Sequence, residues 1–375
     1  MSWLGTWEKR IKVTVSNTNI DTANLTHFPL LLSLGTSVGT GSTDVSCVFD
    51  ELTSDANRKK IAITKTDGTT QLYGEIEKWD DANEKAWIWV SKSDFVLDYD
   101  ATTDVYLYYD STQDDNTTYI GDTNDVVAES VWDSNFKAVY HMSDGADTSH
   151  IYDSTSNDND GTKKGANEPN QVDGLVGKAQ DFDGNDDYID LGNTASMDWA
   201  TQLTVEALIK TDVTNEVNMI ISKYNTVGSN REWYIRNNLQ VLQVNIGDPN
   251  DGTFEGQQSS DNNVITSTAV YYHVSFAFSA NNVDIYVDGA EVASSTTIGA
   301  IPASLYNGAA SLMLGLQNAG TSDWWKGLED EVRISNIARS AGWIKATHYS
   351  LIDGLVSWGS EEEAPSTFTP KIIII

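Results

Sequence analysis

Between residues 177 and 192 the chain reads Gly177-Lys178-Ala179-Gln180-Asp181-Phe182-Asp183-Gly184-Asn185-Asp186-Asp187-Tyr188-Ile189-Asp190-Leu191-Gly192. Apolar and polar residues alternate around an Asp-Gly pair, which is typical of a half-buried strand next to a tight turn. Carboxylates crowd the turn itself. The pattern predicts a strand of a β-sandwich with an acidic cluster beside it.

Short alternating runs of this kind recur along the whole chain at spacings of about ten residues, and turn-forming residues separate them. Clear examples are 11–15, 30–34, 86–90, 104–109 and 203–209. Helical patterns are scarce. The sequence therefore predicts an all-β protein, built as two β-sandwich domains in series.

A chain of 375 residues is too long for one ordinary core, and a polar, turn-rich stretch at 110–125 offers a boundary. We expect an N-terminal sandwich over 1–125 that serves as a platform or spacer, and a second domain over 126–359. The charged segment 360–375 is expected to be a flexible tail. Its isoleucines at 372–375 could form a terminal strand on a neighbouring subunit, or only a local edge strand or a truncated end.

Acidic residues outnumber basic ones by 55 to 23, which gives a formal net charge of −32. Such a surface repels nucleic-acid phosphates, so nucleic-acid binding is not expected. Divalent cations, a saline environment or simple solubility could each account for the excess. No apolar run is long enough for a membrane-spanning helix, and the start of the chain lacks a secretory signal pattern, so neither membrane insertion nor export is predicted.

From residue 131 to 358 the order of motifs resembles the laminin-G-like family of concanavalin A-like jelly rolls. The resemblance rests on 138–142, 153–161, the turn at 182–184, the strand at 203–209, the hairpin at 286–289 and the strand at 326–334. It implies a jelly-roll sandwich that holds glycans or other proteins. Residues 7–110 resemble a second family, domain of unknown function 2341, through 10–15, 28–32, 67–72, 76–79, 87–90 and 105–109; that resemblance implies architecture and no chemistry.

The resemblance also implies a calcium site at the rim of the jelly roll in many family members. Calcium takes several oxygen ligands, and the loops of this domain are rich in carboxylates. We expect Asp153, Asp183 and Asp330 as metal ligands. The alternative, that these residues are acidic turn formers, stays open.

Aromatic side chains in polar loops can stack on sugar rings. Trp324 and Trp325 lie in the polar segment around 320–323, and Trp233 and Tyr234 follow the polar segment 229–231. We expect these four residues to form the ligand-binding surface. The alternative is that they pack in the core.

Catalysis is not predicted. The Glu-x-Asp-x-x-Glu run of sandwich glucanases is absent, and Glu329-Asp330-Glu331 is too compressed to replace it. The five histidines are dispersed, no zinc motif is present, and there is no Gly-x-Ser-x-Gly elbow. A pair of close, buried carboxylates in a cleft would reopen the possibility of a glycoside hydrolase.

These observations favour a non-catalytic structural protein on the virion surface of a bacterial or archaeal virus, as a capsid decoration or tail-associated protein. Its expected partners are other virion proteins or further copies of itself in a homo-oligomer, together with a host-surface glycan. The alternative is a cell-surface or secreted carbohydrate-binding adhesin, and a weaker one is a sandwich-fold glycoside hydrolase.

Overall fold

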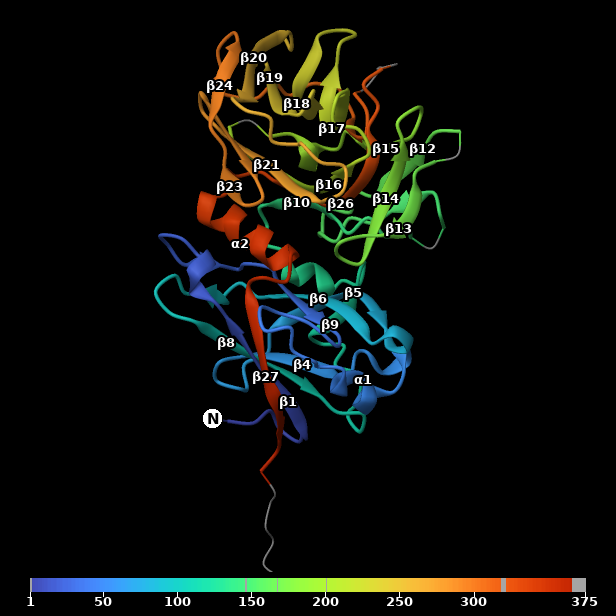
Figure 1. Ribbon diagram of the computed structural model, residues 1–375, viewed down its shortest axis with the longest axis vertical. Helices are drawn as coiled ribbons and strands as arrows, with labels where there is room; N and C mark the ends of the chain where they lie inside the picture. Colours follow the sequence, from blue (N-terminus) through green and yellow to red (C-terminus); the bar gives the residue numbers. More distant parts are fainter. Residues whose placement is uncertain (1, 146, 167, 200, 318–321, 366–375) are drawn as a thin grey trace, which may run out of the picture.

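The computed structural model describes residues 2–145, 147–166, 168–199, 201–317 and 322–365, and it consists of two β-sandwiches stacked along the long axis (Figure 1). The all-β prediction is confirmed. In the first sandwich, one sheet has the order β27 (Val356–Glu363), β1 (Lys9–Val15), β8 (Thr103–Tyr109) and β4 (Ile61–Lys65). The other sheet has the order β3 (Leu30–Leu34), β6 (Lys85–Ser91), β5 (Tyr73–Asp80) and β9 (Ile120–Asp122). A short pair, β2 (Leu25–Thr26) and β7 (Val96–Leu97), lies beside them.

The second sandwich also has two sheets. One sheet has the order β13 (Asn170–Asp173), β14 (Lys178–Asp183), β26 (Lys326–Ser335), β16 (Leu203–Thr211), β21 (Tyr272–Ser279), β22 (Asn282–Val287) and β23 (Ala290–Glu291), and β10 (Phe136–Tyr140) also pairs with β26. The other has the order β11 (His150–Ile151), β12 (Gly161–Lys164), β15 (Tyr188–Gly192), β25 (Leu312–Leu314), β17 (Val217–Asn225), β18 (Asn230–Asn238), β19 (Val241–Gly247), β20 (Phe254–Ser260) and β24 (Ser294–Ile298).

The helices are few and short. They are α1 (Cys47–Leu52), α2 (Ala341–Leu351), and the 3-10 helices η1 (Asn17–Asn19), η2 (Asp55–Asn57), η3 (Asp81–Asn83), η4 (Ala128–Val131) and η5 (Ala195–Met197). Over the described residues, none of them has the length and apolar character that crossing a bilayer requires.

The end of the chain differs from the predicted division. Residues 356–363 form β27, which pairs antiparallel with β1. Residues 356–359, expected in the second domain, and 360–363, expected in the tail, are therefore a strand of the first sandwich. Val356 and Trp358 are buried there. The acidic run at 361–363 is typical of a solvent-exposed, unstructured segment. In the structure, however, Arg10 and Lys9 of β1 form ion pairs with Glu362 and Glu361 across the strands. The expected terminal strand at 372–375 lies outside the described residues.

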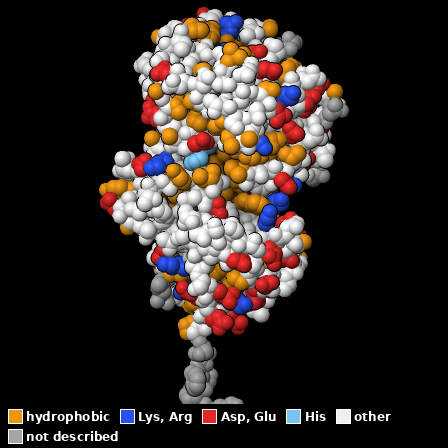
Figure 2. Space-filling model, viewed as in Figure 1, with side chains coloured by type: hydrophobic (Ala, Val, Ile, Leu, Met, Phe, Trp, Pro, Cys, Tyr) orange, Lys and Arg blue, Asp and Glu red, His pale blue; other side chains and the backbone are white. Residues whose placement is uncertain are grey.

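The two sandwiches are joined by a packed apolar junction. Helix α2 lies between them (Figure 1), and its Trp343 contacts Phe28 of the first sandwich and Phe136 of the second, with ring centroids 5.0 and 6.2 Å away. Hydrophobic side chains gather along this waist, while acidic side chains are spread over the first sandwich below it (Figure 2). One buried cluster of apolar residues runs from the first core to Leu208 of the second sandwich. This packing holds the two sandwiches together, so side chains that both domains contribute to the junction keep defined positions.

Candidate functional site

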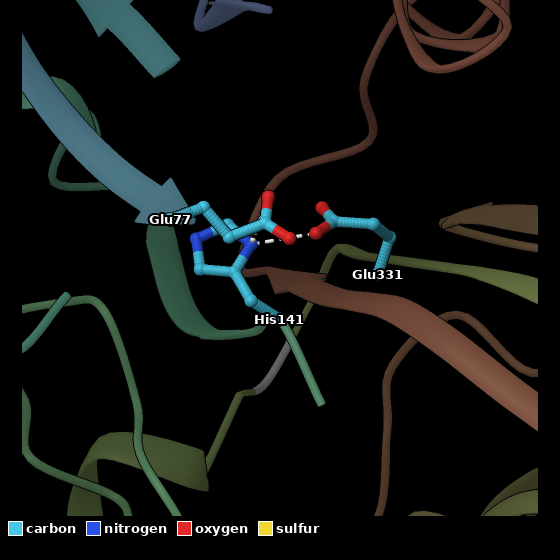
Figure 3. Close-up of side chains that lie close together, drawn as sticks. All are labelled: Glu77, His141 and Glu331. Atoms are coloured by element: carbon cyan, nitrogen blue, oxygen red, sulfur yellow. Dashed lines mark hydrogen bonds and ion pairs between the residues drawn. The ribbon is translucent and has the colours of Figure 1, made fainter. Parts of the chain in front are cut away.

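Ionisable side chains are concentrated at the junction. Glu75 and Glu77 come from β5 of the first sandwich, His141 follows β10, and Glu331 and Arg333 lie on β26 of the second sandwich. All five side chains are at most 2% exposed. We call these residues the junction cluster; Figure 3 shows Glu77, His141 and Glu331 pointing toward one another.

Two β-bulges aim the acidic residues into the cluster. On β5 the pairing with β6 shifts between Ile76 and Lys78, so Glu77 is the extra residue. On β26 the pairing with β16 shifts after Asp330, and Glu331 takes a φ of 49°, which is left-handed and rare for a residue with a side chain. A bulge inserts an unpaired residue and re-aims its side chain. Each domain therefore directs one glutamate out of its regular strand pattern toward the other.

The imidazole of His141 lies among three carboxylates. Its Nδ1 is 2.6 Å from Oε1 of Glu331 and 3.5 Å from Oε2 of Glu77. Its Nε2 is 3.4 Å from Oε1 of Glu75. The ring also stacks on Trp89, with centroids 5.8 Å apart. The histidine thus connects carboxylates of both sandwiches.

Each of the three carboxylates also accepts a hydrogen bond from a donor other than His141. Trp89 Nε1 donates to Glu77 at 2.8 Å, and Arg333 donates to Glu331 at 2.6 Å. Glu75 accepts from Trp132 Nε1 at 2.6 Å and from Ser154 Oγ at 2.7 Å. These bonds fix the orientation of the glutamates, while Oε1 of Glu77 and Nε2 of His141 are buried without a hydrogen-bond partner.

Burial and mutual charge set the protonation of the cluster. Burial acts to lower the pKa of His141, but the carboxylates of Glu331, Glu75 and Glu77 outweigh it and raise that pKa well above its usual value. Burial, together with the charge of Glu331, raises the pKa of Glu77 to about 8. Against burial, His141 and Arg333 hold the pKa of Glu331 below its usual value. At neutral pH the cluster without a ligand therefore holds a charged imidazole, an ionised Glu331 and a protonated Glu77.

A pocket of about 380 Å³ opens beside the cluster, between the two sandwiches. Glu77 and His141 belong to its wall, whereas Glu331 lies behind them. We call it the junction pocket. The first sandwich contributes Asp55, Arg58, Ile76, Glu77, Lys78, Trp79, Asp122 and Thr123, and the second contributes His141, Ser143, Asp144 and Tyr152.

The aromatic residues predicted to bind a ligand are mostly in the core. Trp233 and Trp325 are 1% and 0% exposed and belong to the core of the second sandwich, so neither has a face free for a sugar ring. Tyr234 is also buried and packs edge-on against Tyr224. Trp233 and Tyr234 are adjacent on β18 and point in opposite directions, and both are buried because both faces of that strand are covered. Trp324 is half-buried next to Tyr188 and remains the one partly accessible member of the predicted set.

The predicted calcium ligands do not converge. Asp153 is 1% exposed and accepts hydrogen bonds from the backbone of Val139, Thr155 and Asn159, which ties it into a turn. Asp330 is buried, and its Oδ2 accepts from the N–H groups of Leu175 and Val176. Asp183 instead lies with Asp186 and Asp187, whose carboxylates could hold one ion. Of the three predicted calcium ligands, only Asp183 lies together with other possible metal ligands among the described residues.

Sequence reasoning did not identify the junction cluster. Its members lie on three segments far apart in the chain, and the strand pairings that create the two bulges are not visible in the alternation of residues. The one available signal was the compressed acidic run at 329–331, which is unusual for a central strand. The structure places two buried carboxylates, Glu77 and Glu331, close together beside a pocket. This is the arrangement that would reopen the possibility of a glycoside hydrolase.

Residues 183–345 match the family model Laminin_G_3, described as the Concanavalin A-like lectin/glucanases superfamily. The second sandwich therefore has the predicted concanavalin A-like fold. The resemblance of the first sandwich to domain of unknown function 2341 stays a prediction. No curated protein matches the chain.

Several solved structures are similar. Domain 4 of AbnA, a GH43 extracellular arabinanase from Geobacillus stearothermophilus solved with arabinotriose, is 22% identical over 56% of this chain and 97% of that domain, with a TM-score of 0.42. The binding domain of Paraclostridial Mosquitocidal Protein 1 is 14% identical over 58% of this chain and 52% of its own, with a TM-score of 0.43. The binding domain of Botulinum neurotoxin serotype G is 12% identical over 57% and 51%, with a TM-score of 0.43. The chain thus spans about half of each toxin domain.

Proposed function

We propose that this protein is a non-catalytic glycan-binding protein and that a sugar binds in the junction pocket. The observation that carries the proposal is the composition of the pocket wall, where Trp79 and Tyr152 lie among carboxylates, an arginine and a lysine. Pyranose rings present an apolar face and a polar rim, which aromatic and charged side chains complement. A volume of about 380 Å³ lies within the usual range for small-ligand pockets.

The polar groups of the pocket are already held in place. Arg58 makes two hydrogen bonds to the carboxylate of Asp122, at 2.6 and 2.7 Å, and a third to the carbonyl oxygen of Asp55. On the opposite wall, Asp144 pairs with Lys163 at 2.8 Å. Preorganised groups of this kind lose little conformational freedom on binding, which favours affinity for a small ligand.

The arrangement favours binding over hydrolysis. A glycoside hydrolase needs two carboxyl groups that flank the scissile bond. Of the close pair, Glu77 reaches the pocket wall, but Glu331 lies behind it and is engaged by His141 and Arg333. A sugar in the pocket would therefore meet one carboxyl group of the pair. Release of reducing sugar by the wild-type protein, lost in Glu77→Gln, would instead support the glycoside hydrolase alternative.

We further propose that the protein acts as a structural component on a virion surface, with a cell-surface adhesin as the alternative. The two ends of the described chain lie at the far end of the first sandwich, away from the jelly roll (Figure 1), and residues 3 and 365 border the same cavity. Attachment at that end would present the second sandwich and the junction pocket outward. Electron cryomicroscopy of particles from the native source tests this proposal: regular positions on a capsid or tail support it, and a location on cell envelopes supports the adhesin.

A calcium ion is proposed at Asp183, Asp186 and Asp187, in place of the set predicted from the sequence. Oδ1 of Asp187 is buried without a hydrogen-bond partner, and coordination to a cation would satisfy this oxygen. Addition of Ca²⁺ after treatment with EDTA should raise the melting temperature of the wild-type protein and leave that of Asp187→Asn unchanged. An equal response of both proteins would contradict the site.

A glycan array followed by calorimetry tests the pocket. We expect Trp79→Phe to weaken binding slightly and Trp79→Ala to weaken it by up to about tenfold, since one stacked ring contributes about 0.5–1.5 kcal/mol. The matched control is Trp324→Ala, which removes a half-buried tryptophan outside the pocket. Equal losses in Trp79→Ala and Trp324→Ala, or no loss in the former, would contradict the proposed site.

A further inference from the structure

We infer that Glu77, His141 and Glu331 form a binding site for a divalent transition-metal ion, with Zn²⁺ as the best match, at the floor of the junction pocket. One potential ligand atom from each residue lies within 4.8 Å of the others. Figure 3 shows the three side chains converging from both sandwiches. The inference does not depend on the glycan proposal, because it concerns the metal alone.

The donor set selects the class of metal. Two carboxylate oxygens and one imidazole nitrogen form a mixed set that suits Zn²⁺, whereas calcium and magnesium prefer oxygen ligands throughout. Three protein ligands are also the number found where zinc keeps one open position. Because Glu77 and His141 lie in the pocket wall, water or a ligand in the pocket can occupy that position.

The second ring nitrogen of His141 supports this assignment. A histidine that binds metal through one nitrogen usually donates its other N–H to a carboxylate. If Nδ1 binds the metal, Nε2 carries the proton and faces Oε1 of Glu75 at 3.4 Å. Nε2 has no hydrogen-bond partner in the ligand-free arrangement, and neither does Oε1 of Glu77, although both side chains are at most 2% exposed. These unsatisfied polar atoms are a second observation that points to a ligand.

The carboxylates have the same kind of support. Trp89 donates to Glu77, and Arg333 donates to Glu331, so each glutamate is held by a donor outside the proposed coordination sphere. Such donors orient metal ligands. Zn²⁺ would displace two protons, one from Nδ1 of His141 and one from Glu77, so the net charge of the buried cluster would not change.

The distances require a small adjustment. Tetrahedral zinc with bonds of about 2.0–2.1 Å places its ligand atoms about 3.3 Å apart. Nδ1 of His141 and Oε2 of Glu77 are 3.5 Å apart, which fits. Nδ1 and Oε1 of Glu331 are 2.6 Å apart, as a hydrogen bond requires. The metal therefore replaces the bridging proton, a second proton leaves Glu77 for the solvent, and Glu331 moves away by less than about 1 Å.

The test uses the full chain, stripped with EDTA and titrated with ZnCl₂ or MnCl₂ by calorimetry, with no sugar present. We expect one Zn²⁺ per chain and a first coordination shell of nitrogen and oxygen in X-ray absorption. Glu77→Gln should weaken the affinity at least tenfold. Glu75→Gln, which replaces the carboxylate that faces Nε2 of His141 outside the coordination sphere, should weaken it by about tenfold. The matched control is Glu291→Gln, an exposed glutamate of the second sandwich, which should bind as the wild type does.

Three outcomes would overturn the inference: no stoichiometric binding of either metal, equal affinity in Glu77→Gln and Glu291→Gln, or a coordination shell without nitrogen. If His141→Ala does not fold, the two glutamate variants still decide the question, because glutamine keeps the volume of glutamate. Glycan binding that fails while zinc binds would affect only the glycan proposal.

Discussion

Val13 of β1 lies directly opposite Trp358 of β27, so strands from the two ends of the chain are neighbours in one sheet. The jelly roll is therefore inserted between parts of the first sandwich. Removal of residues 356–375 should expose β1 as an edge and lose the burial of Val356 and Trp358. We expect the melting temperature to fall by roughly 10 °C or more, from the loss of several kcal/mol.

The matched control removes only residues 366–375, which lie beyond β27. It should melt as the full chain does when unfolding is followed by circular dichroism. Trypsin should cleave the first sandwich faster in the longer truncation. Identical melting of both truncated proteins would show that β27 contributes nothing to the stability of the first sandwich.

The sequence predicted the fold class and the jelly roll because both depend on local patterns, alternation and turn residues. It did not predict β27, because the partner of Glu361 and Glu362 is a strand about 350 residues away. Nor could it predict that Trp233 is buried, since a strand such as β18 with both faces covered has no polar face to mark it. Trp325 precedes β26, and its place in the core depends on the packing of the whole second sandwich. The junction cluster depends on bulges at Glu77 and Glu331, which exist only once strands have paired.

Adjacent tryptophans of the second sandwich should respond differently to truncation. Trp325 is fully buried in the core, so Trp325→Ala leaves a large cavity and should cost about 3–5 kcal/mol of unfolding free energy. Trp324 is half-buried, and Trp324→Ala should cost about 1 kcal/mol. Urea unfolding monitored by fluorescence measures both values. A larger loss of unfolding free energy in Trp324→Ala than in Trp325→Ala would contradict the assignment of Trp325 to the core.

Substitution of Gly177 should be costly because this residue lies against Glu77 of the junction cluster. Its φ is 43°, and an added Cβ would lie 1.8 Å from Oε1 of Glu77. Gly192 has a φ of 74° but open space around it, so Gly192→Ala measures the backbone strain alone, about 1–2 kcal/mol. We expect Gly177→Ala to cost about 1–3 kcal/mol more than Gly192→Ala in chemical denaturation, owing to the clash. Equal costs would show that the loop moves away from Glu77 freely.

The acidic cluster at Asp187 should make stability depend on pH. Burial, reinforced by the charges of Asp183 and Asp186, raises the pKa of Asp187 from 3.8 to about 6. At Asp187 the folded state therefore binds a proton more tightly than the unfolded state does. This proton binding stabilises the fold fully below pH 3.8, and the stabilisation is lost as the pH rises through about 6. Asp187→Asn removes the titrating group. In EDTA, the unfolding free energy of Asp187→Asn minus that of the wild type should increase by about 1–2 kcal/mol between pH 4 and 7. The increase is smaller than the full pKa shift implies, because Asp183 is exposed and solvent screens its charge. The exposed control Asp114→Asn should show no such increase in urea titrations across this range, and a relative stability of Asp187→Asn that falls with pH would contradict the assigned direction.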